Sequence, residues 1–154
     1  MVTAEPYTVQ PHFLRKKSRV PSYTYPCPLR WADADAYGHV NNALFLRFME
    51  EARTRMFHAM LAADEAERHQ HAFDVSQSIV DYRAPLVYRN EPVDVTVWVV
   101  SCRGARLELG YMIQDPERTY AEATTKLAAY NLDTGRPRRI SEAEIEFFAR
   151  YTPA

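Results

Sequence analysis

The sequence has little of what several common functional sites require. Only 4 of its 154 residues are glycine, so it offers neither a P-loop nor a dinucleotide-binding fingerprint, which both need closely spaced glycines beside phosphate groups. Its two cysteines, Cys27 and Cys102, lie far apart without a CxxC spacing. That spacing excludes a redox motif or a zinc knuckle, and we expect reduced thiols and no nucleoside triphosphate chemistry.

The sequence also has no excess of positive or negative charge and no long apolar run. Lys and Arg number 19 against 20 Asp and Glu, a formal net charge of −1, whereas a nucleic-acid-binding protein usually carries a basic excess. No stretch reaches the roughly 18 apolar residues of a membrane span, and residues 1–10 lack the charged and apolar regions of a signal peptide. We expect a cytoplasmic protein with no nucleic-acid partner and no membrane span.

The length and composition, with 47% hydrophobic residues, predict one folded domain that needs neither disulfides nor a structural metal. Residues 1–22 contain three prolines and little periodicity, so they are expected to form an extended N-terminal arm, and residues 23–154 the domain. The basic residues of this arm are Arg15, Lys16, Lys17 and Arg19. A solvated tail is the expected role of the arm, and a contact with an anionic ligand or a carrier protein is the alternative.

The only long helical pattern runs from Ala43 to about Leu61. Its apolar residues recur mostly at intervals of three and four, which places them on one helix face. They are Phe45, Phe48, Met49, Ala52, Met56, Ala59 and Met60. Polar residues fill much of the opposite side, so this helix is expected to pack against a sheet. Asn41 or Asn42 can cap its start, because a short side-chain oxygen accepts hydrogen bonds from unpaired first-turn amides.

The rest of the chain alternates with the two-residue period of β-strands. The expected strands span residues 23–31, 75–84, 93–100, 106–113 and 119–130. Hairpin turns are expected at Arg103-Gly104 and Asp115-Pro116-Glu117, a chain break at Asp133-Thr134-Gly135, and a short terminal helix capped by Ser141. This order of elements predicts an α+β domain in which an antiparallel sheet wraps around one long central helix.

The most informative segment is the loop that leads into this helix. Residues 33–42 read D-A-D-A-Y-G-H-V-N-N, and the helix continues with F-M-E-E-A-R at 48–53. This pattern resembles the hotdog-fold acyl-CoA thioesterases of the 4-hydroxybenzoyl-CoA thioesterase type, and also the plant acyl-carrier-protein thioesterases. The resemblance covers about residues 23–140. It implies a hotdog fold and hydrolysis of an acyl-CoA or acyl-carrier-protein thioester to a free acid and a thiol.

The resemblance places the catalytic carboxylate on Asp35, three positions before Gly38. A carboxylate suits the reaction, because it can act as a nucleophile or as a general base for water. The resemblance also assigns the Asn42 backbone amide to the thioester carbonyl, where the positive end of a helix stabilises developing negative charge. Gly38, Val40 and Arg83 are expected to contact the substrate. The alternative for Asp33 and Asp35 is that they only form Asx turns.

Two further residues are candidates with weaker matches. His39 matches the histidine of the plant enzymes' motif, although Tyr37 stands where that motif has asparagine; it could orient water or bind Asp35, or it could pack under the helix start. Glu51 is a second candidate base, because another branch of hotdog thioesterases carries its acid on the helix. A surface ion pair with Arg47 or Arg55 is the alternative for Glu51.

No cofactor and no metal are expected, and the pair His69 and His71 is interpreted as part of a polar loop. Four arginines, at positions 83, 89, 103 and 106, could meet CoA phosphates. The resemblance implies a homodimer or homotetramer with sites at the subunit interface. Two other functions stay open: a hotdog hydratase or dehydratase, whose signature places histidine five residues after aspartate, and a non-catalytic acyl-CoA binding module.

Overall fold

The computed structural model describes residues 20–60 and 69–154, so the predicted N-terminal arm lies outside the described residues except for its last three positions. In chain order the elements are β1 (Tyr23–Cys27), the 3-10 helix η2 (Trp31–Asp33), α1 (Leu44–Met60), β2 (Ala72–Tyr82), β3 (Val93–Arg103), β4 (Arg106–Gln114), β5 (Thr119–Asn131), β6 (Arg136–Pro137) and α3 (Glu142–Ala149). No helix in these described ranges is long and apolar enough to cross a membrane.

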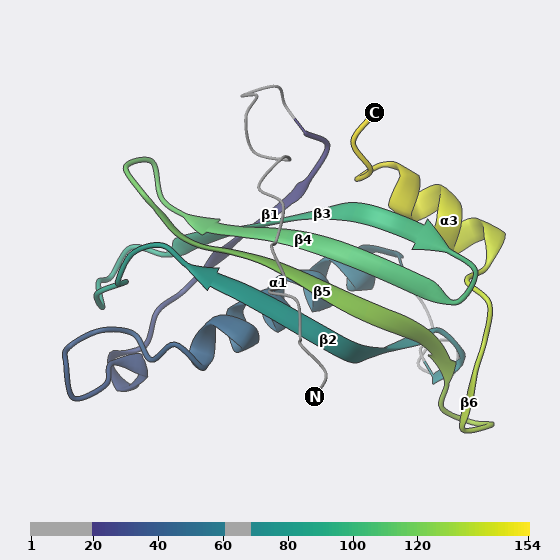
Figure 1. The fold of residues 1–154 in the computed structure, drawn as a ribbon, viewed down its shortest axis with the longest axis horizontal. Helices are drawn as coiled ribbons and strands as arrows, with labels where there is room; N and C mark the ends of the chain where they lie inside the picture. The colour runs from purple at the N-terminus through teal and green to yellow at the C-terminus, as the bar shows by residue number, and fades with distance from the viewer. Residues whose placement is uncertain (1–19, 61–68) are drawn as a thin grey trace, which may run out of the picture.

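The strands form one antiparallel sheet in the order β1-β3-β4-β5-β2, and the short β6 pairs with β5. Helix α1 lies behind this sheet and runs along it, while α3 packs near the end of β3 (Figure 1). The predicted α+β class, with an antiparallel sheet around a long helix, is confirmed. The strand β2 stands at one edge of the sheet, with β5 as its partner.

Strand alternation places the hydrophobic core between the sheet and α1. The odd-numbered valines of β3 are fully buried while their neighbours are only half-buried, as the two-residue pattern predicts. The helix contributes Phe45, Phe48, Met49, Ala52 and Met56 to the same core. This apolar stripe holds α1 on the sheet, because its burial removes a large apolar area from water. We call the face toward α1 the inner face.

The first strand is shorter than the sequence predicts. The expectation of a strand over 23–31 was wrong in its second half, because β1 ends at Cys27, which pairs with Val93, the first residue of β3. Beyond this register position β3 offers no further partner, and Pro28 has no N–H to donate. The chain instead turns through η2, and this turn carries it towards the start of α1.

The terminal helix begins as predicted. The Ser141 hydroxyl accepts a hydrogen bond from the Glu144 amide at 3.2 Å, and the Glu144 carboxylate accepts one from the Ser141 amide at 2.7 Å. This reciprocal arrangement is a capping box, which satisfies two otherwise unpaired donors at the helix start. The buried Glu144 also accepts hydrogen bonds from Arg138, at 2.7 and 2.8 Å, so α3 is tied to the segment after β6.

A close contact on the outer face gives a stability prediction. Gly110 of β4 lies opposite Trp98 of β3, and a Cβ atom at Gly110 would stand 2.3 Å from Trp98 Cε2. We expect Gly110→Ala to displace the indole and lower the free energy of unfolding by about 1–3 kcal/mol. Denaturant unfolding measures this loss. In a Trp98→Ala background the same change should cost little, and an equal cost in both backgrounds would contradict the contact.

Candidate active site

The loop between η2 and α1 closes on itself through backbone hydrogen bonds. The Asp35 amide donates to the His39 carbonyl at 2.7 Å, and the Gly38 amide donates to the Asp35 carbonyl at 3.0 Å. Ala34 and Val40 form a β-bridge across the loop. Gly38 has φ +75°, a left-handed conformation that glycine adopts without the steric cost of a Cβ atom. The resembled motif therefore has a glycine where the turn requires one.

An ion pair fastens this loop to the helix. Asp33 is buried, and its two carboxylate oxygens each accept a hydrogen bond from Arg47 Nη2 at 3.0 Å. The same carboxylate accepts from the Arg30 amide at 2.8 Å, and the Asp33 carbonyl accepts from the Asn41 amide at 2.9 Å. Asp33 thus makes the turn hydrogen bonds expected of it. Its pairing with Arg47 was missed, because residues 14 apart in sequence give no periodic signal.

Asp35 is half-buried and uses one of its oxygens in the loop. Asp35 Oδ1 accepts hydrogen bonds from the Tyr37 amide at 2.9 Å and the His39 amide at 3.3 Å. Asp35 therefore does make the Asx turn that was the alternative to a chemical role. The other oxygen, Oδ2, has no hydrogen-bond partner in the described part of the chain, so it remains available to water or a ligand.

The start of α1 leaves one backbone donor unused. Asn41 Oδ1 accepts from the Ala43 amide at 2.9 Å, so Asn41 is the residue that caps this end. The Asn42 carbonyl accepts from the Phe45 amide at 3.2 Å and from the Tyr82 hydroxyl at 2.7 Å. The Asn42 amide itself meets no acceptor among the described residues. This amide lies at the positive end of the helix dipole, where an oxygen with negative charge is stabilised.

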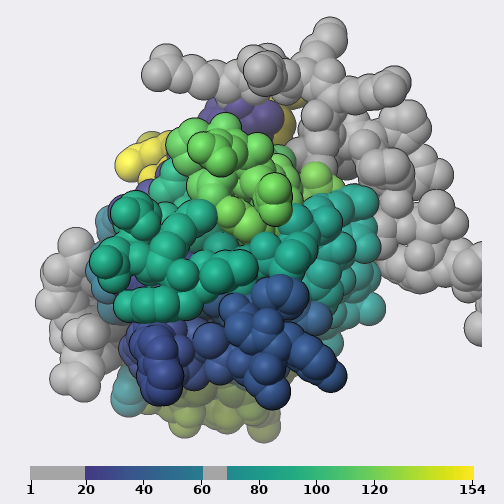
Figure 2. Space-filling view, turned by 90° about the vertical axis from the view of Figure 1, so that its left-hand side faces the viewer, coloured from purple at the N-terminus to yellow at the C-terminus, as the bar shows by residue number. Residues whose placement is uncertain are grey.

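The other predicted site residues lie in different environments. His39 is exposed and contacts Asp35 through its backbone amide, so the interpretation of a ring packed under the helix start is wrong. Val40 is 1% exposed and donates its amide to the Leu86 carbonyl at 2.7 Å, which makes it a core residue beneath the loop. Figure 2 shows this end of the molecule, where the loop in blue lies beside the teal segment that follows β2. Tyr82, which fixes the Asn42 carbonyl, was not predicted.

Two of the four candidate arginines are already paired with carboxylates. Arg83 donates to Glu122 at 2.9 Å and to Asp81 at 3.3 Å, and Arg89 donates to Asp115 at 2.7 Å. The pKa of the Arg83 guanidinium is raised, first by its hydrogen bond to Glu122 and then by the charges of both acids. The positive charge of each of these two arginines is therefore balanced by at least one carboxylate. Both arginines lie at the end of the sheet where the loop is.

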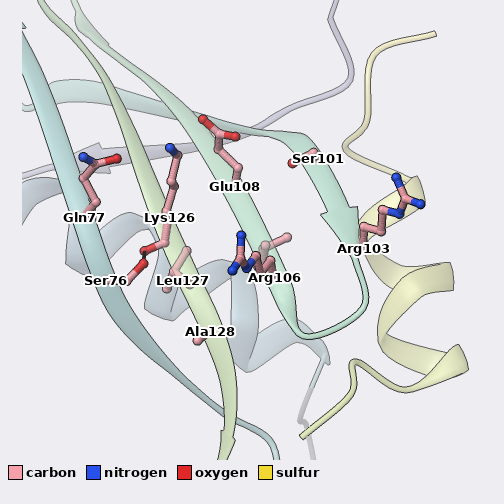
Figure 3. Close-up of a pocket in the computed structure, with 10 residues that line it drawn as sticks. Ser76, Gln77, Ser101, Arg103, Arg106, Glu108, Lys126, Leu127 and Ala128 are labelled. Atoms are coloured by element: carbon pink, nitrogen blue, oxygen red, sulfur yellow. Dashed lines mark hydrogen bonds between the residues drawn. The ribbon is translucent and has the colours of Figure 1, made fainter. Parts of the chain in front are cut away.

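The other two candidate arginines line a hollow of about 700 Å³ on the outer face of the sheet. Arg106 and Lys126 reach over this hollow from β4 and β5, with Ser76 and Gln77 at its β2 side (Figure 3). The strand register places these side chains opposite to α1, near the hairpin of β3 and β4 and at the other end of the sheet from the loop. Arg103 and Arg106 are thus separated from Asp35 within one chain.

Side chains that could compete with Asp35 are occupied or unreactive. Glu51 pairs with Arg47 at 3.5 Å, as its alternative interpretation predicts, and also accepts from the Tyr25 hydroxyl. Burial, together with the Glu51 charge, raises the pKa of the Cys27 thiol to about 12, so this thiol is not a thiolate nucleophile near neutral pH. Residues 20–60 and 69–154 contain no group of three or more metal-ligating side chains.

Comparisons with known proteins identify the family of this chain. The model of the thioesterase-like superfamily matches residues 29–148 of the chain. The chain belongs to this superfamily. A search of curated proteins finds no match. A thioesterase from Thermus thermophilus, solved with coenzyme A and Zn, shares 30% sequence identity over 86% of this chain and 95% of its own, with a TM-score of 0.72.

Two more distant structures share the fold. A 1,4-dihydroxy-2-naphthoyl-CoA thioesterase from Synechocystis is 18% identical, covers 83% of this chain and 96% of its own, and has a TM-score of 0.71. A Staphylococcus aureus protein solved in complex with CoA is 16% identical, covers 86% of this chain and 87% of its own, and has a TM-score of 0.74. These structures confirm the predicted hotdog fold. The match to the thioesterase-like superfamily and the 30% identical Thermus thioesterase show that this protein is a thioesterase.

The two aspartates of the loop should respond differently to substitution. We expect Asp33→Asn to lower the free energy of unfolding by about 2 kcal/mol, because it removes the buried carboxylate that pairs with Arg47 at 3.0 Å and leaves this half-buried guanidinium only its longer, 3.5 Å pair with Glu51. Asp35→Asn should leave stability nearly unchanged, since the amide oxygen still accepts the turn hydrogen bonds. Thermal and denaturant unfolding of the two variants decide this. Equal stability losses would contradict the anchoring role of Asp33.

Proposed function

We propose that this thioesterase hydrolyses acyl-CoA, with Asp35 as its catalytic carboxylate and the Asn42 amide as the donor to the thioester carbonyl. The proposal is supported by two polar groups of the closed loop that can still accept or donate a hydrogen bond to a ligand. These are the Oδ2 oxygen of Asp35 and the amide of Asn42, which no described residue engages. A coenzyme A complex of the 30% identical Thermus protein supports CoA as the carrier of the acyl group.

The reaction needs one base and one donor. In the general-base form, Asp35 removes a proton from water as the water oxygen attacks the thioester carbon, and the carbonyl oxygen gains negative charge beside the Asn42 amide. The C–S bond then breaks, the thiolate takes up a proton, and the free acid and CoA leave. In the nucleophilic form, an Asp35 oxygen attacks the carbonyl carbon, the C–S bond breaks and the CoA thiolate leaves and takes up a proton. Water then hydrolyses the mixed anhydride, which releases the free acid and restores the Asp35 carboxylate. Neither form requires a metal or another cofactor.

Other residues in and near the loop complete the proposed site. The exposed Gly38 leaves room beside Asp35 for the thioester, Val40 supports the loop from the core, and His39 stands in solvent where it can contact the substrate or orient water. We propose that Arg83 contacts the CoA portion of the substrate while it stays paired with Glu122 and Asp81. Hydrolysis of an acyl-carrier-protein thioester, and a cytoplasmic location, stay predictions.

Removal of the carboxylate should abolish most of the activity. We expect Asp35→Asn to lower the turnover of an acyl-CoA panel by at least about 10²-fold, the lower range of what a positioned base supplies. Thiol release followed with a thiol-reactive dye measures this. Asp94→Asn, a change on the outer face of β3, serves as the matched control and should keep wild-type turnover.

The same assay separates the other functions. Wild-type turnover in Asp35→Asn would contradict the assignment and favour Glu51 as the base. Hydration of enoyl-CoAs without thiol release would indicate a hydratase. Binding of acyl-CoA with neither reaction would indicate the binding module.

We also propose a homodimer or a larger homo-oligomer. The edge strand β2 has five consecutive exposed residues, 74–78, and Val75 is 46% exposed. A long edge strand with a free row of backbone donors and acceptors tends to pair with another chain. A second copy would pair there and place its own loop near this sheet edge.

Light scattering at micromolar concentration tests the assembly. We expect a mass of at least twice the 17.9 kDa of one chain. Val75→Lys should shift the distribution towards monomer, because a charge on the edge opposes strand pairing. A mass near that of one chain for the wild type would contradict the proposal.

A further inference from the structure

The peptide groups on either side of Asn42 are held by local hydrogen bonds. In the peptide before it, the Asn41 carbonyl accepts from the Leu44 amide at 2.9 Å. In the peptide after it, the Ala43 amide donates to the Asn41 side chain at 2.9 Å. The Asn42 amide itself meets no acceptor in the described part of the chain, so the hydrogen bonds around it determine where its N–H group points.

Tyr82 adds a hydrogen bond from outside this local segment. It is the last residue of β2, and its hydroxyl donates to the Asn42 carbonyl at 2.7 Å. The Tyr82 backbone pairs with Ala121 of β5, and its ring packs edge-on against Phe45, with ring centroids 5.2 Å apart. Phe45 is 1% exposed. The sheet and the core therefore fix the position of the hydroxyl independently of the loop.

This hydrogen bond restrains a part of the helix that is otherwise weakly held. The Asn42 carbonyl also accepts from the Phe45 amide, but at 3.2 Å and over three residues, and helix ends fray where such bonds are few. Peptide groups are planar, so only the two backbone angles of Asn42 set its amide relative to its carbonyl. A carbonyl held from the sheet thus limits the directions that the Asn42 amide can take.

We propose that Tyr82 is a positioning residue for the thioester carbonyl: its hydroxyl holds the Asn42 carbonyl and so keeps the Asn42 amide aimed at the oxygen that gains negative charge. The inference rests on the proposed function, which makes this amide the donor. Donors stabilise an oxyanion most when they are aligned before the reaction begins. Tyr82 supplies that alignment and transfers no proton.

The protonation of the phenol agrees with this role. Burial raises the pKa of Tyr82 above its ordinary value, so the hydroxyl keeps its proton near neutral pH and can donate it. That proton is directed at the Asn42 carbonyl, and it is therefore engaged rather than free to protonate the leaving thiolate. A phenolate at the same position would repel the carbonyl oxygen.

The kinetic test removes the hydroxyl and keeps the ring. We expect Tyr82→Phe to lower kcat about tenfold and to leave KM within about twofold, because the loss grows as the carbonyl oxygen gains charge. The loss should be smaller than the about 10²–10³-fold effect of deleting an oxyanion donor, since the amide is still present. Tyr88→Phe is the matched control and should keep wild-type kcat, because its hydroxyl lies 3.4 Å from Asn90 Oδ1.

A stability measurement accompanies the kinetics. Tyr82 is 45% exposed, so water can replace its hydroxyl at the Asn42 carbonyl. We expect Tyr82→Phe to unfold at nearly the same denaturant concentration as the wild type. Its lower kcat would then reflect a change at the site rather than partial unfolding.

Infrared spectroscopy of a bound ketone gives a readout that a merely structural role would not change. The probe is an acyl-CoA analogue in which a methylene group replaces the thioester sulfur, so its carbonyl remains and is not hydrolysed. We expect the carbonyl stretching frequency to be lower in the wild-type complex than in water, since a donor polarises the bond. In the Tyr82→Phe complex this shift should be clearly smaller, and in Tyr88→Phe it should equal that of the wild type.

The outcomes separate this inference from the proposed function. An unchanged kcat in Tyr82→Phe, or equal carbonyl frequencies in the two complexes, would overturn the inference and leave the proposed function standing. A higher KM at constant kcat would overturn it by assigning the hydroxyl to substrate binding. A basic limb of kcat/KM that Tyr82→Phe abolishes would overturn it by showing proton transfer. No frequency shift in the wild type would contradict the donor role of Asn42, and with it the proposed function.

Discussion

The ion pair between Asp33 and Arg47 connects the chemistry of this protein to its fold. Asp33 is buried at the end of η2, and Arg47 belongs to the first turns of α1, so the pair holds the loop against the helix that the core positions. The same carboxylate organises the entry to the loop through the Arg30 amide. Asp35 and Asn42 both belong to the segment between Asp33 and Arg47, which this ion pair holds against the helix.

The candidate active site lies at the start of α1, beside the sheet edge that β2 forms. At the start of α1, unused backbone and carboxylate groups suit a thioester and water. The Tyr82 hydroxyl donates to the Asn42 carbonyl at 2.7 Å, and β2 runs on from Tyr82 as the edge strand of the sheet. A second chain paired with the exposed part of β2 would therefore come close to the loop. The proposed active site and the proposed subunit interface thus both border β2.

Local pattern predicted most of the framework, because it depends on residues close in sequence. The spacing of apolar residues alone predicts β3, through its alternating valines, and α1, through its apolar stripe. The loop motif identified Asp35 and Asn42 as candidates. The pairing of Asp33 with Arg47 and the approach of Tyr82 to Asn42 depend on how distant segments meet in space. The early end of β1 likewise follows from where β3 begins. These features can be predicted only when the register of the sheet is known.

The most direct test of Asp35 as the catalytic carboxylate is the pH dependence of kcat/KM for the wild type and for Asp35→Asn. We expect a rate that rises through an acidic limb in the wild type, because the carboxylate acts in its ionised form. In Asp35→Asn the small residual rate should be flat across the same range. An acidic limb that persists unchanged in Asp35→Asn would show that another group carries the reaction, and would contradict the assignment of this residue.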